Sequence, residues 1–303
     1  MASAVTYRRA IRELAAFLSC EPDEEAVFER RLATDPEEYA SSLLRATGTE
    51  LLLVDNGFPP PEAAYGWERL GELAGCEARP VLRIERVAEE APDDVVEHVR
   101  TEVAAARGRG FAALKTIAAY RGGLDLDALP VAARRDRLEG RLVRDVVLAA
   151  LEANGATGAP LPVQVHAGFG DADLLLARAD PTYLKPVIER FRATEFVILH
   201  CYPFVREAGW LAHVYANVHI DLSLAIPHVS RPGELLRQAL ELAPVSKLLY
   251  ASDAARAPEL YYLAARWWRE GLADVLAEAL PADEAEQAGR AILNENARAL
   301  YGL

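Results

Sequence analysis

Short apolar runs recur along the chain from residue 50 onward, and segments of helical character separate them. The first run is ELLLVD at 50–55, and six more follow at 79–85, 111–116, 161–166, 195–200, 217–222 and 247–252. Short apolar runs that alternate with helical patterns predict βαβ units and a parallel sheet. We therefore expect an α/β fold of the TIM-type (β/α) barrel class.

The segment before residue 50 has a different pattern. Ile11, Leu14, Ala15 and Leu18 recur at helical spacing, and no stretch shows the period-two alternation of a strand. We therefore divide the chain into an N-terminal helical segment, 1–49, and a barrel, 50–303. Further helices are expected within 95–103, 131–154, 181–191, 259–280 and 283–301.

The number of strands is one short of a closed barrel. Seven are visible, whereas a (β/α) barrel closes with eight. The missing strand would come before Glu50, so we expect a barrel that lacks its first strand and exposes the backbone edges of the two strands beside the gap. On this interpretation Met1 is a misplaced start, and upstream sequence would restore the strand.

Composition narrows the class of protein. The chain has 303 residues, a 51% hydrophobic content and a net charge of −13, without a lysine- or arginine-rich block. Nucleic acid and anionic membranes are therefore not expected as partners. No apolar run approaches the roughly 20 residues that cross a bilayer. The three cysteines lie far apart without CxxC spacing, so we expect a cytoplasmic protein without disulfides.

Three side chains that can bind metal follow three different apolar runs. His166 and His200 end two of them, and Asp253 lies just past another. A single histidine at a strand end is more often structural than a ligand. The repetition favours function, because barrel active sites draw on the carboxyl ends of several strands. Imidazole and carboxylate groups are ordinary zinc ligands.

Three cations lie at or beyond strand ends. Lys115 closes the run at 111–116, and Arg121 follows it in a glycine-flanked loop. Arg206 comes after the Tyr202–Pro203 turn. A guanidinium at such a position suits a substrate carboxylate, which it can hold with two hydrogen bonds. A solvated surface side chain is the competing interpretation for each of the three.

Longer segments resemble a known family, the amidohydrolase superfamily. They are QVHAGFGDADLLL, VILHCYPFVREAGWLAHVYANVHIDLSL and SKLLYASDAARAPELYYLAAR, and they are most similar to the branch that includes the amidohydrolase domain fused to glutamine-synthetase-like proteins. The resemblance implies a metal-dependent barrel in which His166, His200, Asp253 and Lys115 occupy ligand positions. In some members of the family, the position that matches Lys115 holds a carboxylated lysine that bridges two metal ions. The sequence departs from the family pattern in having no His-x-His pair.

The expected function is metal-assisted hydrolysis of a C–N (amide) bond in a small, carboxylate-bearing substrate, with a divalent metal, zinc by preference, as cofactor. Asp253 would act as general base and then general acid, and His200 would bind the metal or stabilise the oxyanion. Arg121 and Arg206 would bind the substrate. The alternatives are a decarboxylase or hydratase on the same scaffold and a non-catalytic binding or assembly module. The sequence is compatible with a homo-oligomer.

Overall fold

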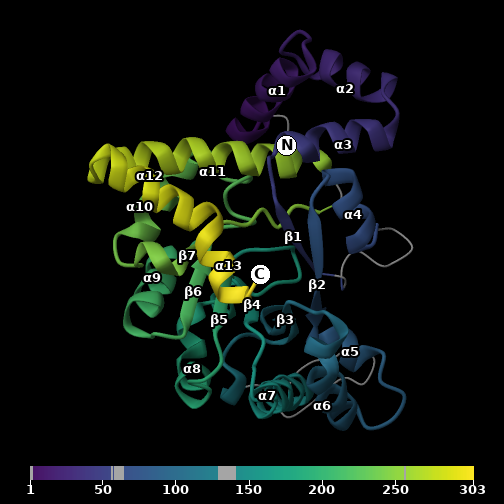
Figure 1. Ribbon diagram of the computed structural model, residues 1–303, viewed down its shortest axis with the longest axis vertical. Coiled ribbons are helices and arrows are strands. Elements are labelled where there is room, and N and C mark those ends of the chain that lie inside the picture. Colours follow the sequence, from purple (N-terminus) through teal and green to yellow (C-terminus); the bar gives the residue numbers. More distant parts are fainter. Residues whose placement is uncertain (1–2, 56, 58–64, 129–140, 256) are drawn as a thin grey trace.

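The computed structural model describes residues 3–55, 57, 65–128, 141–255 and 257–303. Within them, seven strands form one parallel sheet whose spatial order is the chain order. The sheet is curved and helices lie around its outside (Figure 1). The predicted barrel that lacks one strand is confirmed, with β1 and β7 as the two ends of the sheet. The strands are β1 (Leu51–Asp55), β2 (Glu77–Arg83), β3 (Ala113–Thr116), β4 (Val163–Ala167), β5 (Phe196–His200), β6 (Val218–Asp221) and β7 (Leu248–Leu249).

Helices occupy the described parts of the segments in which they were predicted, and further helices lie between other strands. Within the helix predicted at 131–154, residues 131–140 lie outside the described part of the chain and the rest belongs to α7. None of the described helices is long and apolar enough to span a membrane. The helices are α1 (Val5–Leu18), α2 (Glu24–Ala33), α3 (Pro36–Ala46), α4 (Trp67–Ala74), α5 (Ile84–Glu89), α6 (Val95–Ala106), α7 (Arg141–Ala156), α8 (Lys185–Arg190), α9 (Val205–Val214), α10 (Pro232–Leu240), α11 (Pro258–Ala279), α12 (Ala282–Arg290) and α13 (Asn296–Tyr301).

The N-terminal helices pack against the long helix α11. Asp35 caps α3 by accepting hydrogen bonds from the backbone N–H groups of Glu37 and Glu38, and Pro36 occupies the first turn. The hydroxyl of Tyr39 on α3 donates to Glu259 of α11 at 3.1 Å. Trp267 and Trp268 of α11 are among the largest fully buried side chains, so α11 joins these helices to the barrel.

The last strand is shorter than the sequence predicts. We expected a strand over 247–252, but β7 has two residues and the chain then turns away from β6. The backbone N–H of Tyr250 donates to the carbonyl of Ile292, within the π-helical turn Ala291–Glu295. The C-terminal helical segment, rather than another strand, therefore satisfies this backbone at the open end of the sheet.

The barrel interior is filled by inward-facing strand residues and by the C-terminal helix. Val81, Val197 and Leu199 belong to one apolar cluster with Tyr301 of α13. The Tyr301 hydroxyl accepts a hydrogen bond from Gln164 of β4 at 3.0 Å. Because Gln164 precedes His166 by two residues on the same strand face, Tyr301 lies below the strand ends that carry the site.

Candidate active site at the carboxyl ends of the strands

The structure brings His166, His200 and Asp253 together. His166 lies in β4, His200 ends β5 and Asp253 lies in the loop after β7. The two imidazole rings are 4.5 Å apart between centroids, and His200 Nε2 lies 3.7 Å from Asp253 Oδ2. His166 and Asp253 line a cavity of about 1700 Å³ that continues along the inside of β1. His200 is fully buried behind them.

Both imidazoles present an unpartnered nitrogen in a buried environment. Nε2 of His166 and Nε2 of His200 have no hydrogen-bond partner among the described residues. Burial lowers the pKa of each imidazole well below its usual value, and the Lys115 ammonium adds to this effect in both. The two rings are therefore neutral at physiological pH. A neutral imidazole with a free nitrogen is the form that binds a metal.

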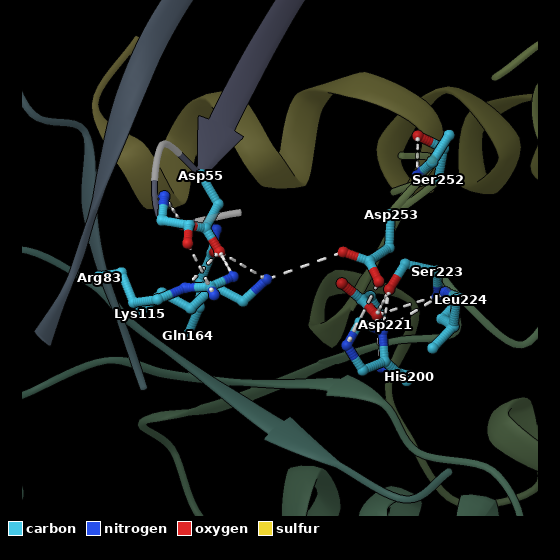
Figure 2. A network of polar contacts seen from close by, with 12 residues as sticks. Asp55, Arg83, Lys115, Gln164, His200, Asp221, Ser223, Leu224, Ser252 and Asp253 are labelled. Carbon is cyan, nitrogen blue, oxygen red and sulfur yellow. Dashed lines mark hydrogen bonds and ion pairs between the residues drawn. The ribbon is translucent and has the colours of Figure 1, made fainter. Parts of the chain in front are cut away.

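A buried ion-pair cluster formed by Asp55, Arg83 and Lys115 lies beside Asp253 and His200 (Figure 2). Lys115 Nζ lies 3.1 Å from Asp55 Oδ2 and 3.7 Å from Asp253 Oδ1. Burial alone would lower the pKa of Lys115, but the two carboxylates raise it above its usual value. Lys115 is thus held as a charged ammonium group, whereas a metal ligand or a carboxylated lysine requires the deprotonated amine.

Arg83 was not recognised in the sequence. Its guanidinium donates to Asp55 Oδ2, from Nε at 3.1 Å, and to the carbonyl of Gly57 at 3.2 Å. Burial tends to raise the pKa of Asp55, but Lys115 and Arg83 together hold it below its usual value. The available signal was that Arg83 is a cation near the end of the apolar run at 79–85.

Asp221 and Ser223 form a second group that the sequence interpretation missed. Ser223 Oγ lies 2.6 Å from Nδ1 of His200 and donates to Asp221 Oδ1 at 2.7 Å. Burial raises the pKa of Asp221 to about 6, against the effect of its hydrogen bonds from His200 and Ser223. Asp221 ends β6, so its position at a strand end was the signal that could have identified it.

The loops after β3 and β4 build one wall of the cavity. The ring of Tyr120 lies 4.6 Å from that of His166, and its hydroxyl accepts from the backbone N–H of Asp171 at 3.1 Å. Gly168 has a φ of 78°, and a Cβ there would lie 2.2 Å from the carbonyl oxygen of Tyr202. Only glycine fits this close approach of the loop after β4 to the loop after β5.

The two candidate arginines have different surroundings. Arg121 lines the cavity, with its Nη2 3.2 Å from Glu89 and its buried Nε without a partner in the described chain. Arg206 lies on α9 with a side chain that is 63% exposed, and it pairs with Glu241 at 3.0 Å. Arg206 is not among the residues that line the cavity, because α9 directs it to the outer surface.

The backbone is strained at the site. Non-glycine residues with positive φ are rare, and three of the four in the described chain are His200, Cys201 and Asp253. Each such conformation costs on the order of 1–3 kcal/mol. These costs are concentrated where the candidate ligands are aimed, which is typical of a functional site.

His219 is a buried histidine away from the candidate site. It lies in β6 and is 8% exposed, with its Nδ1 3.5 Å from Glu195. Burial lowers its pKa to about 4, and the Lys247 ammonium contributes. Pairing with Glu195 would raise the pKa of His219. We expect the effect of burial to prevail, because His219 and Glu195 form no hydrogen bond and the charge of Glu195 also interacts with Lys247.

His219 is therefore expected to make the fold sensitive to acid. A folded-state pKa below the unfolded value gives a contribution that is fully present above pH 6.5 and is lost as the pH falls to about 4. This difference in pKa corresponds to a loss of roughly 3 kcal/mol in the free energy of unfolding. Urea unfolding at several pH values should show His219→Asn losing less stability over this range than the wild type. The exposed His213 supplies the control, since His213→Asn should keep the wild-type slope. Equal slopes for wild type and His219→Asn would contradict the assignment.

The donor atoms of the site fit a divalent metal. Two neutral imidazoles with buried, unpartnered Nε2 atoms and a nearby carboxylate are the ligands of catalytic zinc sites. Among the described residues, however, no three histidine, cysteine or carboxylate side chains are already arranged as a complete ligand set. The donor groups are therefore of the right chemical type for a divalent cation. To bind the same cation, Asp253 and His166 would have to move closer together.

Comparison with known proteins identifies relatives along most of the chain. The amidohydrolase family model matches residues 77–303. Protein fluG of Emericella nidulans is 28% identical over 99% of this chain, which spans 41% of fluG. A protein of Lactobacillus casei ATCC 334 assigned as a metal-dependent hydrolase has a similar structure, with a TM-score of 0.87 at 27% identity over 99% of this chain and 85% of its own.

A more distant similarity concerns the fold alone. A uronate isomerase from Bacillus halodurans C-125 aligns with a TM-score of 0.64 over 98% of this chain and 76% of its own, at 15% identity. The same scaffold therefore occurs in proteins whose names indicate hydrolysis and isomerisation. Fold does not distinguish these reactions, so the arrangement of side chains has to carry the functional argument.

Proposed function

Because the chain belongs to the amidohydrolase family, we propose that it is a metal-dependent hydrolase. It would cleave a C–N (amide) bond in a small, carboxylate-bearing molecule. The observation that carries the proposal is the convergence of two buried imidazole nitrogens, which lack a partner among the described residues, with the carboxylate of Asp253, beside a cavity that His166 and Asp253 line. The resemblance of the structure to a protein assigned as a metal-dependent hydrolase supports it.

The chain's own residues have distinct roles in this proposal. His166 Nε2, His200 Nε2 and Asp253 would hold the divalent cation, for which zinc is the first candidate. The cation supplies Lewis-acid chemistry, since it polarises the scissile carbonyl and lowers the pKa of a water molecule. The other role considered for His200, stabilisation of the oxyanion, would instead require a proton on Nε2, because only an N–H group can donate to the oxyanion.

Asp253 is placed to move the proton that hydrolysis requires. Its carboxylate would accept a proton from the attacking water and return it to the nitrogen as the C–N bond breaks. The Lys115 ammonium, 3.7 Å from Asp253 Oδ1, offsets the negative charge of the carboxylate. Asp55, which also pairs with Arg83, holds Lys115 in this place, so the cluster positions a charge beside the reacting groups.

Turnover of a panel of small amides tests the proposal. With amides that carry a carboxylate group, the zinc-loaded protein should release one amine and one new carboxylic acid for each water molecule consumed. A decarboxylated or hydrated product would instead support the alternative chemistry on this scaffold. The absence of a His-x-His pair favours the other alternative, a binding or assembly module. On that alternative, a protein that holds one equivalent of metal should bind the small molecule without converting it.

Arg121 is the proposed anchor for the substrate carboxylate. Replacing Arg121 by Ala should raise KM for carboxylate-bearing amides by the equivalent of about 1.5–3 kcal/mol, because a charged hydrogen bond is lost. Neutral analogues should be little affected. Steady-state kinetics on matched charged and neutral substrates measures the difference.

Arg206 provides the matched control for Arg121. It is also paired with one glutamate, but it lies on the outer surface of α9. Arg206→Ala should leave KM unchanged for both substrate types. An equal change in KM for charged and neutral substrates in Arg121→Ala would exclude the carboxylate role.

A further inference from the structure

We propose that Ser223 and Asp221 are positioning residues that fix the tautomer of His200. In this arrangement the imidazole carries its proton on Nδ1 and presents an unprotonated Nε2 toward Asp253. The proposal deepens the proposed function and rests on it for the role of Nε2. The tautomer itself follows from contacts that involve no substrate and no metal.

The hydrogen-bond donors around Asp221 determine where the protons lie. Oδ1 of Asp221 lies 2.8 Å from the backbone nitrogen of His200, 3.0 Å from that of Ser223 and 2.7 Å from Ser223 Oγ. Both backbone groups are obligatory donors, so this oxygen acts only as an acceptor. The single hydroxyl proton of Ser223 therefore points to Asp221.

The consequence for His200 is direct. Ser223 Oγ lies 2.6 Å from Nδ1 of His200. Since the hydroxyl proton is already donated to Asp221, the oxygen can only accept, and Nδ1 has to supply the proton. A second group, the backbone nitrogen of Leu224, lies 3.4 Å from Nδ1. The Leu224 N–H is also a donor, so it could bond only to an unprotonated Nδ1. The contact with Ser223 is shorter, and it requires Nδ1 to be protonated, so we assign the proton to Nδ1.

The same carboxylate anchors the main chain of His200. This residue has a φ of 66°, in the left-handed region, and its N–H is held by Asp221 (Figure 2). Backbone and ring are thus fixed by one acceptor, directly and through Ser223. The ring is left with a single free nitrogen, Nε2, which is buried, has no hydrogen-bond partner in the described part of the chain and lies 3.7 Å from Asp253 Oδ2.

Replacing Ser223 by Ala gives a sharp test. The only remaining neighbour of Nδ1 among the contacts described is the donor at Leu224, so Nδ1 should become an acceptor and the proton should move to Nε2. Long-range ¹H–¹⁵N spectra of the metal-free, labelled protein report the protonation of each ring nitrogen. The His200 signals are identified by their loss in His200→Asn. The wild type should show a protonated Nδ1, and Ser223→Ala a protonated Nε2.

Binding of Zn²⁺ alone, measured by competition with a chromogenic chelator, provides the second readout. Groups that orient a metal-binding histidine typically contribute 10–100-fold to affinity, so Ser223→Ala should weaken Zn²⁺ binding by about that factor. Ser223→Thr keeps the hydroxyl and should restore both the tautomer and the affinity. Ser42→Ala removes a hydroxyl that donates to a carbonyl within α3 and should change neither.

Two results would overturn the proposal. One is a wild-type His200 that is protonated on Nε2, and the other is a Ser223→Ala protein that keeps the wild-type tautomer. If Ser223→Ala does not fold, the wild-type spectrum and Ser223→Thr still decide the point. A correct tautomer together with absent amide turnover would refute the proposed function and leave the positioning role intact.

Discussion

Replacing Asp253 by Asn is expected to lower kcat for amide hydrolysis by about 10²–10⁴-fold, the usual contribution of a general acid–base. The amide side chain is similar in shape, but it cannot accept a proton from water and return it to the leaving nitrogen. Steady-state kinetics measures the loss. Metal content should be determined in the same samples, because Asp253 is also a proposed ligand.

A matched aspartate separates this effect from a general change of charge. Asp274 lies exposed on α11, and Asp274→Asn should retain full activity. If Asp253→Asn binds as much metal as the wild type and is still slow, the loss belongs to proton transfer. If it binds as much metal and hydrolyses the substrate at the wild-type rate, Asp253 is not the acid–base group.

Removing the charge of Asp55 should cause the largest loss of stability. Asp55→Asn is expected to lower the free energy of unfolding by about 3–5 kcal/mol, because it leaves Lys115 and Arg83 buried without their shared carboxylate. The side chains of Asp55 and Arg83 are 14% and 13% exposed, and Lys115 is 8% exposed. Chemical denaturation monitored by tryptophan fluorescence measures the difference.

The surface pair of Glu37 and Arg69 is the control for this burial argument. Both of its side chains are 43% exposed, so the attraction is screened by solvent. Glu37→Gln should therefore change the free energy of unfolding by less than about 1 kcal/mol. Similar losses in Asp55→Asn and Glu37→Gln would contradict the distinction between the buried cluster and the surface pair.

The fold was predictable because apolar runs mark buried parallel strands directly. The ends of β1 and β5 agree with the sequence at Asp55 and His200, where a turn-forming residue soon follows. The prediction was wrong for β7, which stops after Leu249. Its sequence, KLLYAS, is as apolar as the others, but the length of a strand at the edge of a sheet depends on which groups lie beside it. Here the carbonyl of Ile292, 42 residues later, takes the N–H of Tyr250.

The site was predictable in part for a similar reason. His166, His200 and Asp253 follow strands, and parallel topology brings strand ends to one face. Arg83 also ends a strand, but its importance, like that of Ser223, comes from a partner far along the chain. Arg83 meets Asp55 across 28 residues, and Ser223 meets His200 across 23. Arg206 also follows a strand, yet the first turn of α9 carries it outward.

The unsatisfied nitrogens of His166 and His200 have a thermodynamic consequence. Each buried polar atom that lacks a hydrogen-bond partner costs about 1–3 kcal/mol, and neither nitrogen has one among the described residues, so a ligand that contacts both would relieve this cost. Any ligand that satisfies both atoms binds the folded chain alone, and at 100 times its Kd it would add roughly 2.7 kcal/mol. The melting temperature thus becomes a reporter of occupancy, and screening candidate cations or substrates by thermal shift requires no assay of turnover.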